Sequence, residues 1–141
     1  MSAYADTSFL VSLYVLDANS VPAAARMKRA ALPLLMSPIG ELELINAISL
    51  RLFRRELSVA KVNAAHALVR RDLQDGVLQI RALPSSAFER AKQMARTQTP
   101  RLGTRTIDVL HVASAVALQA DKFYTFDRRQ ARLARVAGLA A

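Results

Sequence analysis

Short apolar runs alternate along the chain with longer segments in which apolar positions recur every three or four residues. The first pattern is typical of buried parallel strands and the second of amphipathic helices. Strands that alternate with helices predict a three-layer α/β/α sandwich with a central parallel sheet of about four to five short strands, in a single domain over 1–141. We expect strands at 2–5, 34–36, 77–80 and 122–126, and helices over 7–16, 21–31, 38–55, 58–73, 85–96, 107–118 and 128–136.

The most informative stretch is 106–127, where a helix that is apolar on nearly every side is followed by a short strand. A helix of this kind is usually buried. It nevertheless carries Asp108 in its first turn and His111 one turn later, and the strand ends at Asp127. A carboxylate at the edge of an apolar layer needs a partner, and none is adjacent in the sequence.

The beginning of the chain has the same order of strand, acid and helix. The apolar segment 2–5 stops at Asp6, and Thr7 then starts a helical run. Residues just beyond the carboxyl ends of parallel strands gather at one edge of the sheet, where ligands bind. If strands 2–5 and 122–126 are neighbours, about 5 Å apart, Asp6 and Asp127 converge within metal-bridging reach.

Composition narrows the class of protein. Of the 141 residues, 52% are hydrophobic, which is enough for a folded domain with its own core. No apolar run is long enough to span a bilayer and no signal-peptide pattern opens the chain, so we expect a cytoplasmic protein with no membrane partner. The absence of cysteine excludes disulfides, thiol catalysis and cysteine-ligated zinc. The net charge of +9 suits a polyanion, nucleic acid first and an anionic membrane second, and a solvated basic surface explains it equally well.

Most of the 11 acidic residues have an ordinary explanation in loops or on polar helix faces. Glu41 lies in the first turn of its helix, where the helix dipole favours a negative charge. Glu43 lies deeper, among apolar residues, and faces nearly the opposite side because the two glutamates are two positions apart. Asn46 shares the face of Glu43. We therefore favour Glu43 as the inward acid.

Four acids then stand out as a set: Asp6, Glu43, Asp108 and Asp127. Carboxylates held together repel one another unless a cation is present. Oxygen ligands of this kind suit Mg²⁺ or Mn²⁺, and such an ion can activate water and neutralise the charge of a phosphate. An acidic pocket in a basic protein is the combination expected of a nuclease.

Four segments resemble the motifs of PIN-domain ribonucleases, and most of all the VapC-type toxins of prokaryotic toxin–antitoxin pairs. They occur in the family's order, and the resemblance extends over essentially the whole chain. Each is weak alone, and together they are specific. The segments are A-D-T-S-F-L-V (5–11), E-L-I-N-A (43–47), I-D-V-L-H-V-A-S-A (107–115) and Y-T-F-D-R-R-Q (124–130).

The resemblance implies a metal-dependent endoribonuclease with Mg²⁺ or Mn²⁺ as cofactor. Whether one or two ions bind is not decided by the sequence. It also implies a homodimer and a cognate antitoxin whose peptide covers the acidic pocket. The apolar residues at 10, 11 and 13–16 exceed what one small core needs, which predicts apolar surface for such a dimer. The family often has a further strand after its last helix, whereas only Gly138 to Ala141 remain here. Carried over, the catalytic acids are Asp6, Glu43, Asp108 and Asp127, the metal ligands Asp6, Asp108 and Asp127, and the supporting residues Thr7, Asn46 and Thr125.

Three side chains near these motifs have open roles. His111 is either a general base or metal ligand, or, as we favour, a packed residue bonded to backbone or carboxylate. Arg101 and Arg105 flank the loop before Asp108 and are candidates for gripping RNA phosphate or the antitoxin, although a solvated basic loop explains them equally well. The leading interpretation is a toxin ribonuclease. The alternatives are a PIN-type nuclease in RNA maturation or acting on DNA, and a non-catalytic RNA-binding module.

Overall fold

Four strands of three residues each form the central sheet of the computed structural model, which describes residues 1–141. The strands are β1 (Ala3–Ala5), β2 (Leu34–Met36), β3 (Leu78–Ile80) and β4 (Lys122–Tyr124). Every pair is parallel, and the order across the sheet is β3-β2-β1-β4. The predicted parallel sheet is therefore confirmed, and the first and last strands are neighbours, as the argument about Asp6 and Asp127 required.

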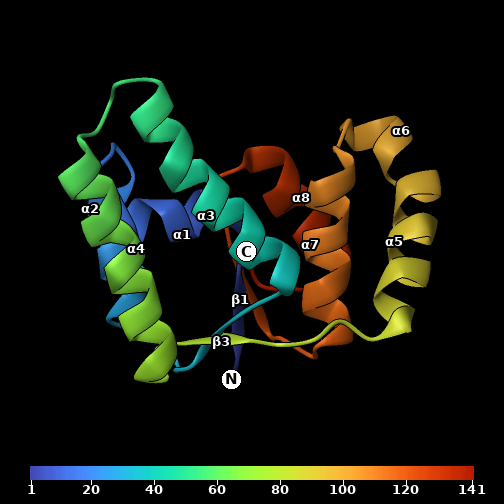
Figure 1. Cartoon of the computed structure of the whole chain (residues 1–141). Helices are drawn as coiled ribbons and strands as arrows, with labels where there is room; N and C mark the ends of the chain where they lie inside the picture. The colour runs from blue at the N-terminus through green and yellow to red at the C-terminus, as the bar shows by residue number, and fades with distance from the viewer.

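Helices cover both faces of this sheet (Figure 1). The first four lie on one side and the last four on the other, so the sheet is the middle of three layers. This confirms the predicted α/β/α architecture. The helices are α1 (Thr7–Tyr14), α2 (Ser20–Met27), α3 (Pro38–Phe53), α4 (Val59–Gln74), α5 (Ser85–Thr97), α6 (Thr99–Leu102), α7 (Thr106–Ala117) and α8 (Arg128–Val136).

The alternation of side chains along the strands divides the core into two clusters, because successive side chains point to opposite faces. Ala3 and Ala5 belong to the cluster under α1, α3 and α4. Tyr4 belongs to the cluster under α7 and α8, where its ring stacks on Phe123 of β4 with centroids 5.7 Å apart. The side chain at position 6 continues this alternation on the side of Tyr4, beyond the end of β1.

Local chemistry explains where the chain departs from the predicted boundaries. Within 97–105, predicted to be a loop, Pro100 lies in the first turn of α6 and Gly103 ends it in the left-handed region, at φ 66°. β4 stops two residues earlier than predicted because Thr125 turns the chain and accepts a hydrogen bond from the Asp127 amide at 3.0 Å. After α8, a single parallel bridge pairs Ala140 with Lys122, so a fifth strand is reduced to one residue.

One inference about the early helices is wrong. The apolar residues at 10, 11 and 13–16 were expected to exceed the needs of one core, which would leave apolar surface for a dimer. Leu10 and Val15 are instead buried, and Val11, Leu13 and Tyr14 pack against the same cluster, because α1 lies directly on the sheet between α2 and α3. Only Leu16 is widely exposed, at 88%. None of the helices combines the length and apolar character that crossing a bilayer requires.

Candidate active site

Asp6 follows β1 and is the most enclosed of the four acids, with 3% of the residue exposed. It caps α1, accepting from the Phe9 amide at 2.9 Å, and its oxygens also accept from Ser8 Oγ at 2.8 and 3.0 Å and Thr125 Oγ1 at 2.6 Å. Burial raises the pKa of Asp6 above its ordinary value, and these hydrogen bonds only partly oppose the rise. The fold therefore places the Asp6 carboxyl group where its ionisation is energetically unfavourable.

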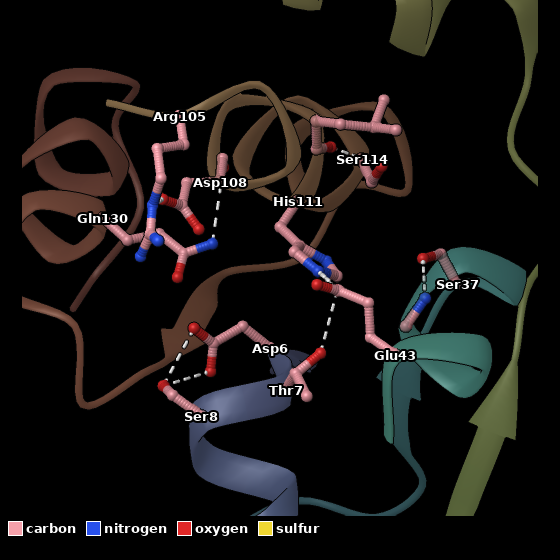
Figure 2. A network of polar contacts seen from close by, with 12 residues as sticks. Asp6, Thr7, Ser8, Ser37, Glu43, Arg105, Asp108, His111, Ser114 and Gln130 are labelled. Carbon is pink, nitrogen blue, oxygen red and sulfur yellow. Dashed lines mark hydrogen bonds and ion pairs between the residues drawn. The ribbon is translucent and has the colours of Figure 1, made fainter. Parts of the chain in front are cut away.

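Glu43 projects from α3 toward the residue that follows Asp6 (Figure 2). Thr7 Oγ1 donates to Glu43 Oε1 at 2.9 Å, and His111 Nε2 contacts the same oxygen. Partial burial raises the pKa of Glu43, but the hydrogen bond and the positive charge of His111, with the bond from Thr7, outweigh burial and hold it below its usual value. Glu41 lies on another side of α3, where it lines a groove with His66 and Arg70 of α4.

A chain of buried polar contacts continues behind Glu43. His111 is 3% exposed, and its Nδ1 lies 2.7 Å from the hydroxyl oxygen of Tyr4. That hydroxyl lies 3.0 Å from Ser37 Oγ, which caps α3 by accepting from the Gly40 amide at 3.0 Å. Burial raises the pKa of Tyr4, so this phenol stays protonated. The chain of contacts ties β1, α3 and α7 together directly beneath the acids.

Asp108 and Asp127 face a cation of the chain itself. Arg105 Nε lies 3.5 Å from Asp108 Oδ2, and an amino nitrogen of the same guanidinium lies 4.0 Å from Asp127 Oδ2. Asp127 also caps α8 by accepting from the Gln130 amide at 3.0 Å. Here the molecule is hollowed by an open cavity of about 280 Å³, lined without a hydrophobic residue by Gly103, Arg105, Asp108, Asp127, Arg128 and Arg129.

The donor chemistry of the four acids fits Mg²⁺ or Mn²⁺, because hard divalent cations take carboxylate oxygens. The side chains, however, are not drawn together around one point. No three acidic or histidine side chains form a group that could hold one ion. Asp6 accepts from Ser8 and Thr125, whereas Asp127 faces Arg105, so the two carboxylates have different partners and their convergence on one metal ion stays a prediction.

The predicted supporting residues have separate places. Thr7 serves Glu43 and Thr125 serves Asp6, whereas Asn46 is exposed and has no hydrogen bond to either. Arg101 donates to Gln98 and does not touch the acids.

Several site residues were not anticipated from the sequence. Gln130 is 1% exposed and reaches both Thr125 Oγ1 and the backbone oxygen of Asp108, at 3.2 and 3.4 Å. The sequence did contain a signal for Gln130, because a glutamine three residues after a capping aspartate matches the pattern of a capping box. Ser8 had no such signal, and neither did the hydroxyl of Tyr4 or its contact with Ser37.

Comparison with known proteins gives a family and a structural likeness. A family model described as the PIN domain matches residues 3–136. The fold is similar to the crystal structure of Mycobacterium tuberculosis VapC20, described as a sarcin-ricin loop cleaving toxin, with a TM-score of 0.71 and 17% sequence identity over 99% of this chain and 98% of that chain. None of the curated proteins matches the chain significantly in sequence.

Proposed function

This chain belongs to the PIN-domain family, and on that basis we propose that it is a Mg²⁺- or Mn²⁺-dependent endoribonuclease, the toxin of a type II toxin–antitoxin pair. The observation that supports the proposal is that Asp6, Glu43 and Asp108 lie in one network of polar contacts (Figure 2), at the carboxyl ends of the strands, which we call the acidic edge. Arg105 links Asp108 to Asp127 there, beside an open cavity lined by arginines. The likeness in fold to VapC20, a toxin that cleaves the sarcin-ricin loop, supports the same class of activity.

In this proposal Asp6, Asp108 and Asp127 hold the metal, and Glu43 is the fourth acid. When bound, Mg²⁺ or Mn²⁺ supplies charge neutralisation at the phosphate and activation of water. The protein holds Asp6 and Glu43 in place through Ser8, Thr125, Thr7 and His111. Arg105 balances Asp108 and Asp127, so the two like charges tolerate each other.

The basic rim of the cavity suits an RNA backbone. Arg105, Arg128 and Arg129 line the cavity, and guanidinium groups bind phosphate oxygens bidentately. The net charge of +9 adds a long-range attraction. The cavity is open rather than a closed slot, which favours a single-stranded or looped segment. Arg101 lies two residues before Gly103 and does not line the cavity, so its contact with RNA stays a prediction.

The proposed protein partners are a second copy of the chain and a cognate antitoxin. With α1 largely packed, the apolar surface that such partners require lies elsewhere. Leu42 and Phe53 of α3 are 67% and 84% exposed, and Val59 at the start of α4 is 58% exposed. Large exposed apolar side chains are the surface that a protein partner can bury, and contiguous patches of them mark interfaces. The proposed antitoxin segment also covers the cavity beside Asp108 and Asp127 and blocks cleavage.

The test is expression of the wild type beside Asp6→Asn, with growth and RNA integrity followed together. The wild type is expected to arrest growth and fragment RNA, whereas Asp6→Asn does neither and accumulates to the same level. Normal growth with intact RNA in both strains, at equal amounts of folded protein, would refute the toxin. If the purified wild type still cleaves RNA with Mg²⁺, the nuclease remains and only the toxin role fails.

A further inference from the structure

The hydrogen bonds around Glu43 are one-sided. Thr7 Oγ1 and His111 Nε2 both contact Oε1, and no protein group bonds to Oε2. The side chain is 32% exposed, so the second oxygen is the one left for a ligand. Glu43 therefore has one oxygen that the protein fixes and a second oxygen that is free to bind a ligand from solution.

We propose that His111 is a positioning residue: it fixes Oε1 of Glu43, with Tyr4 and Ser37 holding the imidazole in turn, so that Oε2 is presented at the acidic edge. The inference rests on the proposed function, because it concerns the same site. It assigns His111 a role through Glu43 instead of direct contact with RNA or metal.

Burial excludes direct chemistry by the imidazole. His111 is 3% exposed and both ring nitrogens are engaged, one with Glu43 and the other with the Tyr4 hydroxyl. An ionised carboxylate only accepts hydrogen bonds, so Nε2 carries a proton at the contact with Glu43. Because the buried His111 ring already donates to Glu43, it orients that carboxylate and does not itself contact RNA or metal.

The support behind the ring is rigid. Tyr4 is fully buried in the middle of β1 and stacks on Phe123, and Ser37 is 1% exposed at the cap of α3. The hydroxyl of Tyr4 lies within hydrogen-bonding distance of both His111 Nδ1 and Ser37 Oγ, at 2.7 and 3.0 Å. The second nitrogen of a functional histidine sets the orientation of the ring in this way. No buried polar side-chain atom of the protein lacks a partner, so the chain of contacts is complete.

The advantage of such a device is conformational. A glutamate loses more rotamer freedom than most side chains when it is fixed in one geometry. Two donors on one oxygen remove that freedom during folding, before substrate arrives. Residues that support a metal-associated carboxylate typically change activity or metal affinity about 10–100-fold when they are altered.

The closing experiment compares His111→Gln with His111→Asn. The glutamine amide reaches the position of Nε2 and keeps a donor toward Glu43, whereas the shorter asparagine amide reaches only the position of Nδ1. We expect His111→Asn to lower kcat on an RNA oligonucleotide about 10–100-fold with KM little changed, and His111→Gln to recover most of it. Two controls are expected to match wild type: His66→Asn on α4, and Tyr14→Phe, which removes a hydroxyl bonded to Asp72. Tyr4→Phe removes the hydroxyl behind His111 and is expected to lower kcat several-fold.

Combining His111→Asn with Glu43→Gln separates positioning from an independent role. If His111 acts through Glu43, the double variant is no slower than Glu43→Gln alone, because contacting residues that act as one unit are non-additive. Additive losses, or equal losses in His111→Gln and His111→Asn, would overturn the inference. So would full activity of His111→Asn.

A structural measurement keeps this test independent of the proposed function. In crystal structures, Glu43 is expected in a single rotamer in the wild type and in His111→Gln, and in several in His111→Asn. An unchanged single rotamer in His111→Asn overturns the positioning role even if the protein is inactive. Absence of any RNA cleavage by the wild type with Mg²⁺ or Mn²⁺ refutes the proposed function and leaves the rotamer result to judge the inference.

Discussion

The two halves of the acidic edge are built in opposite ways. The inner half consists of Asp6 and Glu43, whose oxygens accept from Thr7, Ser8, Thr125 and His111 within the fold. The outer half consists of Asp108 and Asp127, and Oδ2 of each faces Arg105, a side chain that is 81% exposed. Oδ1 of Asp127 also caps α8 by accepting from the Gln130 amide. The inner carboxylates thus have two side-chain donors each within the fold, whereas the only side chain that contacts the outer carboxylates is that of Arg105.

This difference indicates a division of labour between the halves. Short hydrogen bonds from buried donors give a fixed geometry, which a reacting centre needs. Contacts of 3.5 and 4.0 Å to an exposed guanidinium are weak in water and screened by salt. The outer half is therefore the part that a divalent ion or an RNA phosphate can rearrange, and each experiment below acts on one half.

Removal of divalent metal is expected to have the largest effect, because it acts mainly on the outer half. With excess EDTA, cleavage of an RNA oligonucleotide should fall to background, and added Mg²⁺ or Mn²⁺ should restore it. The reason is that the clustered carboxylates need a cation stronger than one exposed arginine. Cleavage at full speed in excess chelator would show that the outer half works without metal.

The glutamates of α3 test whether the inner half is catalytic. Glu43→Gln keeps the size of the side chain but removes its charge, and it should slow cleavage on the order of 10²-fold or more. Glu41→Gln loses only the favourable term at the helix N-terminus, roughly 0.3–1 kcal/mol of stability, with near-normal cleavage. Initial rates at fixed Mg²⁺ and thermal melting measure both. Inactivity of Glu41→Gln beside a normal Glu43→Gln would mean that the functional face of α3 has been misassigned.

The pH dependence of stability in EDTA should separate the two inner acids. The native pKa of Asp6 is raised, so above about pH 4 the native state holds a proton that the unfolded chain has released, and stability falls as pH rises. Asp6→Asn removes that fall and should melt higher than wild type near neutral pH, each 1 kcal/mol appearing as roughly 2–4 °C.

Glu43 has the opposite sign. Its native pKa is lowered, so its stabilising contribution is present above its ordinary pKa and is lost as the pH falls through the native one. Glu43→Gln should therefore melt lower than wild type at neutral pH and approach it in acid. Parallel melting curves for the two variants from pH 3.5 to 7 would contradict the assigned contrast within the inner half.

Arg105 gives the smallest expected effect and concerns the outer half alone. In an Asp6→Asn background, which prevents cleavage, Arg105→Ala should weaken RNA binding a few-fold and lower the slope of log affinity against log salt by about 1. Arg71→Ala on α4, where the arginine pairs with Asp75, is the control and should bind as the parent does. An unchanged salt slope for Arg105→Ala would mean that this arginine does not bind RNA phosphate and only pairs with the acids.

The sequence was enough to predict the outline of the fold, but it predicted less of the candidate site. The strand–acid–helix pattern predicted the parallel sheet, and the period of α3 distinguished Glu43 from Glu41, because both follow from local periodicity. The contact of Tyr4 with His111 joins residues 107 positions apart and depends on which strands are neighbours. The pairing of Arg105 with Asp108 and Asp127 depends on a long, exposed side chain, for which a sequence pattern sets no direction.

The shortness of β1 has a consequence for how the chain can change length. Within four positions this strand and its end supply Tyr4, which holds the histidine, Asp6, which caps α1, and Thr7, which holds the glutamate. Successive side chains in a strand point to opposite faces, so adding or removing one residue here would exchange the two faces. The stretch from Thr97 to Arg105 carries no comparable constraint on register. Insertions and deletions should accumulate in that stretch among homologous chains, while the distance from Tyr4 to Thr7 stays fixed.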